Sequence, residues 1–528
     1  MKGRNMDSFQ TLCRSAIVIW IWNGFSALGT VYQSDGSAAS VQGLHDQVLN
    51  GDTITIPAGT FTWTSGIRFT KAITLQGQTT TNPVNGTAVD TTKIIDNLTD
   101  RNKPIIELNG NGGQRITGIS FFGQNTNTMF NGGIRIEGGS TPDRIDHCHF
   151  HGLHCYPSIG VFAQNWGVLD HNVKDDSVVG NEGFVHFWPG AHTDLGDSLF
   201  EAPAGFGGPN FLFLEDNYMN SGTDITAGGK ICARHNIIVG NNSFGSHGTG
   251  RTFPNGRGGR AYEIYNNEFR YNNNYSSLDG PDSGSSVYHD NTVTPHTRGI
   301  ASQVFRQFYS FGSPFFGADG GNPWDSNDPQ LYASGTLSSV SGANKTDNAK
   351  HWTTNQWVGY EVRRPSDGIT ALVQSNTATT LTLYEWHNQG WATGNSYEIC
   401  RVLRVLDQPG LGAGVHINRN SPAWPNPSPE PMYAWNNTNQ DDGSHFGFTV
   451  AGPTDAIQAG RDYFNNTPMP GYVPYTYPHP LVSNATPTPA PTSTPSPSST
   501  PTATPTATPG PTATVTPTPR PHPSHPPR

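Results

Sequence analysis

Short runs of alternating apolar and polar residues recur along most of this chain, and many of the runs close on an asparagine. Three of them lie within residues 212–268 and read LEDNY (214–218), ARHNI (233–237) and IYNNE (264–268). An alternation with a period of two is typical of β-strands. The polar positions are mainly glycine, asparagine, threonine and serine, which suit strands and turns. The chain is therefore expected to consist of many short strands joined by turns.

The same phrase can be aligned along residues 116–293, which indicates a repeat. Most intervals between aligned copies are about 20–30 residues, a period that is typical of a solenoid with one coil per repeat and with insertions as loops. Because each coil is built from short strands, we expect parallel strands stacked about 4.8 Å apart. The side-chain amides of the aligned asparagines are expected to form a hydrogen-bonded ladder along the stack. These asparagines are Asn172, Asn217, Asn236, Asn267 and Asn291.

A helical pattern interrupts the strands near the N-terminus. Val41, Leu44 and Val48 recur at helical spacing and form one apolar face. Asn50 and Gly51 tolerate positive φ angles and are expected to end this helix. A short amphipathic helix followed by strands is suited to cap the open end of a solenoid core.

Residues 1–29 have the pattern of a secretory signal peptide. Basic residues precede the apolar run 16–22, and small residues at 27–29 provide a cleavage site. We expect the mature chain to begin near Thr30, to be extracellular and to contain no membrane span, because the apolar run is too short for one. An uncleaved N-terminal anchor is the alternative interpretation.

Two later segments differ in composition and in hydrophobic pattern from the predicted solenoid of residues 30–330. Residues 331–400 alternate as antiparallel strands do, and we interpret them as a small β-rich insertion before the solenoid resumes and closes over 401–483. Residues 484–528 are rich in proline and threonine and contain no acidic residue. Such a segment forms no core, so we expect a disordered, extended tail that serves as a surface tether or a spacer.

Several aromatic residues of the predicted insertion have two interpretations. They either fill a small core or stack on sugar rings from an exposed face. The residues are Trp352, Trp357, Tyr360, Trp386 and Trp391.

Charge and cysteine content narrow the classes of function. The formal net charge of the chain is −10, which argues against nucleic acid as the main partner, because phosphate binding needs a basic face. Outside the predicted signal the cysteines are too few for a disulfide framework in a chain of this length. Cys148 and Cys155 either pair or remain buried thiols.

The pattern resembles the right-handed parallel β-helix of the pectate-lyase-like superfamily, in its secreted bacterial members. The resemblance rests on the phrases GDTITIPAG (51–59), GVLDHN (167–172), RHN (234–236), LDQPG (406–410) and YPHPL (477–481). It extends over roughly the predicted solenoid and its closing segment. It implies an all-β, right-handed parallel β-helix that acts on a polysaccharide.

Residues 228–260 carry a local excess of positive charge, with five basic residues and no acidic one. In an acidic protein such a stretch indicates an anionic ligand. A uronate polysaccharide fits this charge, and Arg251, Arg257 and Arg260 are the predicted substrate-binding residues.

The resemblance also implies a lyase chemistry for this region. In β-elimination a base removes the proton beside the uronate carboxylate, and a cation, in such enzymes often Ca²⁺ held by aspartate, neutralises that carboxylate. By resemblance, Asp216, Asp224 and Glu215 would bind Ca²⁺. Lys230 or Arg234 would be the base, with a pKa lowered by neighbouring positive charge. His247 is a further candidate base. The alternative is that these residues are solvated charges and turn caps.

Two other clusters could carry chemistry. On a strand His147, His149 and His151 would point to one side, and a histidine row can bind a transition metal. The alternative is a structural row of turn histidines, because the spacing matches no closed zinc motif. Asp175 and Asp176 resemble the paired acids of inverting β-helix hydrolases.

The first functional hypothesis is therefore a secreted, monomeric lyase that cleaves an acidic glycan. A tethered surface protein that binds glycan without cleaving it, and a glycoside hydrolase, are the alternatives.

Overall fold

A computed structural model describes most of the predicted β-rich region. The described residues are 29–129, 132–162, 166–175, 183–187, 202–220, 222–240, 244–246, 258–270, 277–303, 331–358, 360–366, 369–383, 390–401, 407–412, 428–451 and 457–483. The elements below all belong to the unit Met1–Asn484. The predicted signal peptide, up to residue 28, and the predicted tail lie outside the described residues.

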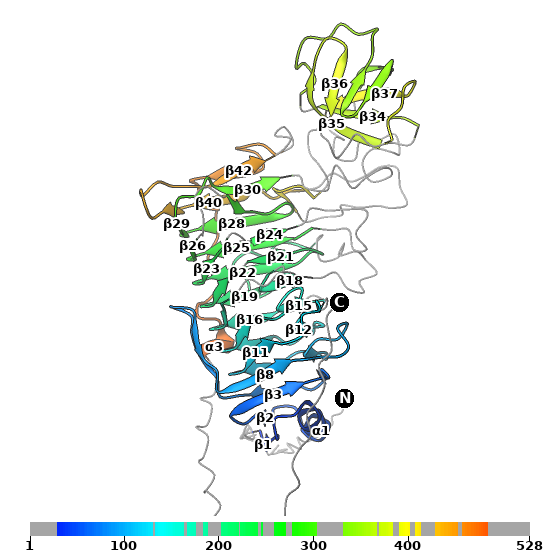
Figure 1. Cartoon of the computed structure of the whole chain (residues 1–528). Helices are drawn as coiled ribbons and strands as arrows, with labels where there is room; N and C mark the ends of the chain where they lie inside the picture. The colour runs from blue at the N-terminus through cyan, green and yellow to red at the C-terminus, as the bar shows by residue number, and fades with distance from the viewer. Residues whose placement is uncertain are drawn as a thin grey trace, which may run out of the picture. The chain divides into compact units, whose positions relative to one another are not determined.

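Parallel sheets stack coil upon coil, so the protein is an all-β, right-handed parallel β-helix, as the sequence predicts (Figure 1). Sheet A contains β1 (Val31–Gln33), β2 (Thr53–Thr55), β5 (Thr74–Gln76), β10 (Arg115–Thr117), β13 (Asp143–Asp146), β16 (Gly167–Asp170), β19 (Leu212–Glu215), β22 (Lys230–Arg234), β25 (Ala261–Tyr265), β28 (Ser285–His289), β40 (Met432–Trp435) and β43 (Tyr463–Asn465). Sheet B contains β3 (Gly59–Trp63), β8 (Thr92–Asp96), β11 (Ser120–Gly123), β14 (His149–His151), β17 (Val173–Lys174), β20 (Tyr218–Asn220), β23 (Ile237–Val239), β26 (Glu268–Arg270), β29 (Thr292–Thr294) and β41 (Thr438–Asn439).

Sheet C closes each of the earlier coils. It contains β4 (Ile67–Phe69), β9 (Ile106–Leu108), β12 (Ile134–Ile136), β15 (Ile159–Val161), β18 (Val185–Phe187), β21 (Thr223–Ile225) and β24 (Phe244–Ser246). A further parallel sheet is formed by β27 (Leu278–Asp279), β30 (Ile300–Gln303) and β42 (Phe448–Ala451), and a short antiparallel pair by β38 (Leu411–Gly412) and β39 (Ser428–Pro429).

The period-two pattern directs one row of each sheet into the coil. In sheet A, Ile116 pairs in register with Ile145, which pairs with Leu169, and all three side chains are buried. In sheet B, Phe121 lies beside Phe150, and their rings stack at 5.4 Å. Because parallel coils place equivalent residues above one another, the apolar positions merge into one continuous core.

The asparagine ladder is confirmed and lies at the turn between sheets A and B. From Asn217 onward, the Oδ1 atom of each asparagine accepts hydrogen bonds from the backbone N–H and the side-chain amide of the preceding asparagine. For Asn217 and Asn236 these two distances are 3.0 and 2.9 Å. The ladder continues beyond the predicted rungs to Asn437, which accepts from Asn291 at 2.8 Å. The residue before each rung has a left-handed backbone, as at His235 (φ 59°).

The predicted N-terminal helix is α1 (Ala38–Gln47). The Ser37 hydroxyl caps it by accepting a hydrogen bond from the backbone N–H of Ser40 at 3.1 Å. Val41 and His45 are buried, and the imidazole of His45 stacks on Phe69 of β4 at 5.2 Å. The helix thus covers the first coil of the core.

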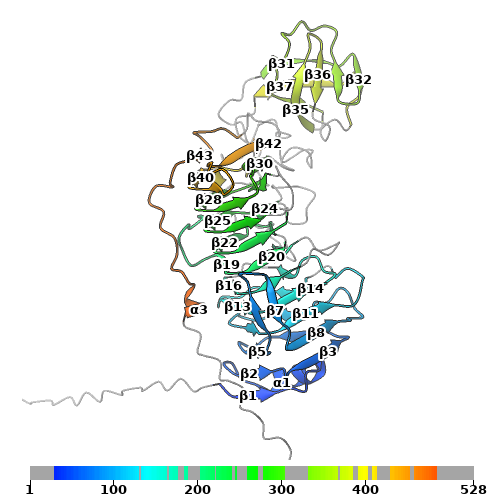
Figure 2. The ribbon, with the colours of Figure 1, turned by 60° about the vertical axis from the view of Figure 1, so that its left-hand side comes forward.

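A hairpin of β6 (Thr80–Asn82) and β7 (Thr87–Val89) crosses later coils (Figure 2). The Thr81 hydroxyl donates to the carbonyl of His171 at 2.5 Å. Gly86 has a φ of 67°, and a Cβ atom there would lie 2.5 Å from the ring of Tyr218. Glycine is therefore required where the hairpin tip meets sheet B.

The predicted insertion is an antiparallel sheet. Its strands are β31 (Leu331–Thr336), β32 (Ser339–Ser341), β33 (Asn344–Thr346), β34 (Tyr360–Arg364), β35 (Ile369–Asn376), β36 (Thr380–Leu383) and β37 (Ser396–Arg401). Trp357 and Trp391 are buried in its core, and Trp352 and Tyr360 pack against that core. The core interpretation therefore holds for these four aromatics, whereas Trp386 lies outside the described residues.

After β43 the chain runs back along the outer face of sheet A, and we call residues 472–483 the C-terminal strap. It ends in α3 (Pro480–Ser483), which lies against β16 (Figure 2). The ring of Tyr475 packs on Phe213 at 5.3 Å, and Arg144 donates to the carbonyl of Leu481 at 2.9 Å. The strap therefore covers several coils of sheet A.

One buried carboxylate beneath the strap makes the free energy of unfolding depend on pH. Glu263 is buried and accepts hydrogen bonds from the Gly207 N–H at 2.7 Å and from the Tyr472 hydroxyl at 2.8 Å. Burial outweighs these bonds and raises the pKa of Glu263 from 4.5 to about 7. The folded state thus binds an extra proton between these values, and the stability that this proton provides is lost as the pH rises from 4.5 through 7.

We expect Glu263→Gln to be more stable than the wild type above pH 7, because a neutral amide removes the cost of the buried charge. The upper limit is about 3 kcal/mol, since one pKa unit corresponds to about 1.4 kcal/mol. Urea unfolding between pH 4 and 8 measures this difference. A stability difference between Glu263→Gln and the wild type that does not change with pH would contradict the raised pKa of Glu263.

Candidate functional site

Two histidines of sheet B point away from the core. His149 and His151 occupy the ends of β14, and Phe150 between them points inward. The side chain of His149 is 7% exposed, whereas that of His151 is 46% exposed. One imidazole is thus nearly covered and the other faces solvent.

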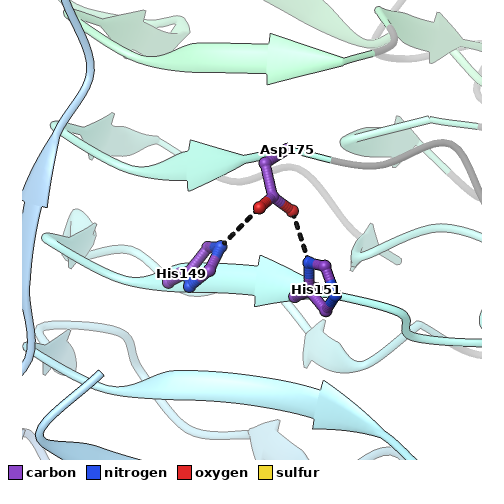
Figure 3. Close-up of side chains that lie close together, drawn as sticks. All are labelled: His149, His151 and Asp175. Atoms are coloured by element: carbon purple, nitrogen blue, oxygen red, sulfur yellow. Dashed lines mark hydrogen bonds and ion pairs between the residues drawn. The ribbon is translucent and has the colours of Figure 1, made fainter. Parts of the chain in front are cut away.

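Asp175 brings the two histidines together. It directly follows β17, the strand next to β14, and its carboxylate lies between the two rings (Figure 3). Asp175 Oδ1 is 2.7 Å from His151 Nδ1, and Asp175 Oδ2 is 3.2 Å from His149 Nε2. Together with Asp90 these residues form what we call the histidine–aspartate cluster.

Asp90 holds His149 from the opposite side. It follows the hairpin β6–β7, and its Oδ1 lies 2.7 Å from His149 Nδ1. The Ser120 hydroxyl donates to the same oxygen at 2.7 Å, and Thr79 lies 2.8 Å from Ser120. A chain of hydrogen bonds therefore fixes the orientation of the His149 ring.

Carboxylates dominate the electrostatics of the cluster. Burial disfavours the charged form of His149, but the neighbouring carboxylates of Asp175 and Asp90 outweigh it and raise the pKa of His149. Burial also disfavours the charged form of Asp175, which by itself would raise its pKa, but the two histidines outweigh this effect and lower the Asp175 pKa. The cluster thus favours a positive charge between its two carboxylates.

The Nε2 atom of His149 stands out within this arrangement. It is buried, and no group among the described residues forms a hydrogen bond with it. Asp175 Oδ2 lies 3.2 Å from this nitrogen. The two atoms are not aligned as a hydrogen bond requires, so the contact is an ion pair. A nitrogen lone pair this close to a carboxylate oxygen repels it unless a proton or another cation lies between the two atoms.

An aromatic ring and a lysine extend the outer face beside the cluster. The ring of Phe122 on β11 lies 4.9 Å from that of His151 and 5.5 Å from that of His149. Lys93 on β8 places its Nζ atom 4.0 Å from the centre of the Phe122 ring. Aromatic faces pack on sugar rings, and an ammonium group attracts carboxylates.

The cluster can perform two kinds of chemistry. Imidazoles positioned by carboxylates can accept and return a proton. The donor atoms of His149, His151 and Asp175 also lie within 4.8 Å of one another, close enough to hold a metal ion.

A second group within the described ranges meets the same distance criterion. It consists of His296, Asp441 and Asp442, whose side chains are 37–49% exposed. Asp442 accepts from the backbone N–H of Ser444 at 2.8 Å. This exposed group serves below as a comparison for the buried one.

Lys230 and Arg260 of the predicted basic site come together at the outer edge of sheet A. Lys230 donates to the carbonyl of Pro203 at 2.6 Å, and Arg260 donates to the carbonyl of Ala202 and pairs with Glu430. Burial, with Arg260 as the second cause, lowers the pKa of Lys230 to about 8. The lowered pKa of Lys230 agrees in direction with the expected shift, and the role of Lys230 as a base stays a prediction.

Arg234 and Asp216 lie against the C-terminal strap. Arg234 is fully buried, pairs with Glu215 and donates to the carbonyls of Tyr475 and Thr476. Asp216 is at the left-handed turn position before Asn217 and accepts from the Tyr477 hydroxyl at 2.8 Å. These contacts give both residues a structural role, and the catalytic role of Arg234 and the Ca²⁺-binding role of Asp216 stay predictions.

The other predicted site residues are dispersed or not described. Asp224 is on β21 of sheet C, where its carboxylate lies 3.7 Å from His186, so the structure does not bring it together with Asp216. The remaining predicted residues lie outside the described residues. They are His247, Arg251 and Arg257, together with Asp176 of the hydrolase hypothesis.

The histidine row divides into two parts. His147 has a left-handed backbone (φ 52°) at the turn before β14, and its ring stacks on that of His171 at 5.0 Å. The expectation of three histidines on one face was therefore wrong for His147, because a turn breaks the alternation. Cys148 and Cys155 are buried free thiols.

In the part of the chain that the structure describes, no helix has the length and apolar character that crossing a membrane requires. Comparison of the chain with protein-family models, with curated proteins and with solved structures finds no match.

Proposed function

We propose that this protein is a secreted, polysaccharide-active member of the pectate-lyase-like superfamily, and that it cleaves an acidic glycan on the outer face of sheet B. The observation that carries the proposal is the histidine–aspartate cluster, in which carboxylates hold two imidazoles at a partly open surface. The parallel β-helix is compatible with many functions, so the site carries the argument and the fold alone does not.

The proposed reaction is β-elimination beside a uronate carboxylate. It requires a group that accepts the proton next to the carboxylate and positive charge that neutralises the carboxylate. The imidazoles of the cluster provide proton acceptors, and Lys93 provides an ammonium group beside Phe122. The glycosidic oxygen leaves with a proton, and an unsaturated sugar remains.

The test is product formation on a panel of pectate, alginate and other uronans, together with neutral glycans. We expect absorbance from unsaturated uronate with the wild type, and a rate at least about 100-fold lower for Asp175→Asn, because the histidines lose the charge that orients them. Asp442→Asn in the exposed group is the matched control and should leave the rate unchanged.

Other results would assign a different function. New reducing ends without unsaturated product would indicate a hydrolase. Glycan binding without any product, unchanged in Asp175→Asn, would favour a binding protein and contradict the proposal.

A further inference from the structure

The histidine–aspartate cluster has features that proton transfer does not require. A general base needs one oriented imidazole with a free nitrogen, and His151 with Asp175 would be enough. The cluster adds a second imidazole, nearly buried, whose Nε2 atom lies 3.2 Å from the same carboxylate and forms no hydrogen bond among the described residues. Two imidazole nitrogens and one carboxylate around one point are a ligand set typical of divalent transition metals.

We propose that His149, His151 and Asp175 bind one divalent transition-metal ion, with the Nε2 atom of His149 as one ligand. This deepens the proposed function: when bound, the ion would supply a hydroxide that accepts the proton in place of the free imidazoles. That use of the ion on a glycan rests on the proposed function, but the binding of the ion does not.

The second layer of the site supports a metal-binding role for His149. Metal-bound histidines usually donate their other ring N–H to a carboxylate, which fixes the tautomer. Asp90 is in this position, 2.7 Å from His149 Nδ1, and is itself held by Ser120 at 2.7 Å. A proton on Nδ1 leaves a lone pair on Nε2, which lies 3.2 Å from Asp175 Oδ2.

The distances within the cluster suit an ion after small shifts. Bonds of about 2.1 Å at tetrahedral or octahedral angles place neighbouring donor atoms about 3.0–3.4 Å apart. The observed separations from Asp175 are 3.2 Å to His149 Nε2 and 2.7 Å to His151 Nδ1. An ion between them would replace the repulsion at Nε2 by a bond.

The open side of the site indicates an accessible ion. His151 and Asp175 have side chains 46% and 30% exposed, so a substrate oxygen or water can complete the coordination, as in catalytic sites. Nitrogen ligands favour Zn²⁺, Co²⁺ or Mn²⁺ over Ca²⁺, which prefers an all-oxygen shell. The ion expected here differs in both class and position from the Ca²⁺ expected at Asp216 and Asp224.

The test is titration of the metal-free full-length chain with Co²⁺, followed by its visible spectrum and by equilibrium dialysis, with Zn²⁺ as competitor. We expect one Co²⁺ per chain at this cluster. Affinity should fall at least about 100-fold in His149→Gln and in Asp175→Asn, and about 10–100-fold in Asp90→Asn, which removes only the orienting charge.

Asp442→Asn is the matched control, because it alters the exposed group of the same residue types. Its Co²⁺ affinity should equal that of the wild type. Loss of binding in this variant, or unchanged binding in Asp175→Asn, would overturn the proposal, as would a wild type that binds Ca²⁺ but not Co²⁺ at the cluster.

A second measurement covers the case in which a variant fails to fold. Anomalous diffraction from Co²⁺-soaked wild-type crystals should place the ion about 2.1 Å from His149 Nε2, and an ion elsewhere would contradict the inference. Both measurements need no glycan. A protein that binds Co²⁺ here but cleaves no polymer would retain the metal site and lose only the proposed reaction.

Discussion

Arg234→Ala is expected to lower the free energy of unfolding by about 3–5 kcal/mol, because it leaves a buried carboxylate without its counter-charge. Arg234 and Glu215 are both 0% exposed, and Arg234 Nε donates to Glu215 Oε1 at 2.8 Å. The guanidinium also donates to the carbonyls of Tyr475 and Thr476. The substitution therefore disrupts sheet A and the C-terminal strap together.

Urea unfolding measures the loss, and hydrogen exchange locates it, with faster exchange expected in residues 472–483. Arg270→Ala is the matched control. Arg270 pairs with Glu268 on sheet B, but both side chains are partly exposed, and such pairs contribute less than about 1 kcal/mol. Equal losses in the two variants would contradict the structural role of Arg234.

Asn236→Ala is expected to cost about 2–4 kcal/mol, because it removes an interior rung of the asparagine ladder. The backbone N–H and side-chain amide of Asn217 lose their acceptor, and the carbonyl of Leu214 loses a donor. Each buried polar group left without a partner costs about 1–3 kcal/mol. Partial relaxation of the turn keeps the total below the simple sum.

The ladder also couples neighbouring coils, so the substitution should broaden the unfolding transition. In a solenoid each coil contacts mainly its neighbours, and a weakened interface lets the two sides unfold separately. Asn85→Ala, an exposed turn asparagine whose side chain accepts one hydrogen bond from Thr87, should change stability by less than about 0.5 kcal/mol. Similar effects at both positions would contradict the ladder as a source of stability.

The fold and the ladder were predictable because the same requirement recurs in each coil. Because each ladder asparagine bonds to the next one, asparagine recurs at the equivalent position of successive coils, as at Asn217 and Asn236. The same alignment places Glu215 opposite Arg234. A count of basic residues over 228–260 overlooks such a partner, because Glu215 lies outside that stretch of sequence.

The candidate site was only partly predictable. The outward direction of His149 and His151 follows from alternation, and extending the alignment of Cys148 with Asn172 by three residues places Asp175 beside His151. Asp90 reaches the cluster because the β6–β7 hairpin folds over it, and no periodic pattern in the sequence specifies that fold. The C-terminal strap was not predictable for a similar reason, since Tyr477 contacts Asp216 across 261 residues of sequence.

We propose that the chemistry takes place on sheet B and not at the basic stretch on sheet A. The most direct test compares the initial rates of unsaturated-uronate formation by Asp175→Asn and by Lys230→Met, each with its folded state checked by circular dichroism. We expect a loss of at least about 100-fold in Asp175→Asn and a rate close to that of the wild type in Lys230→Met. Full activity in Asp175→Asn together with an inactive, folded Lys230→Met would contradict the claim.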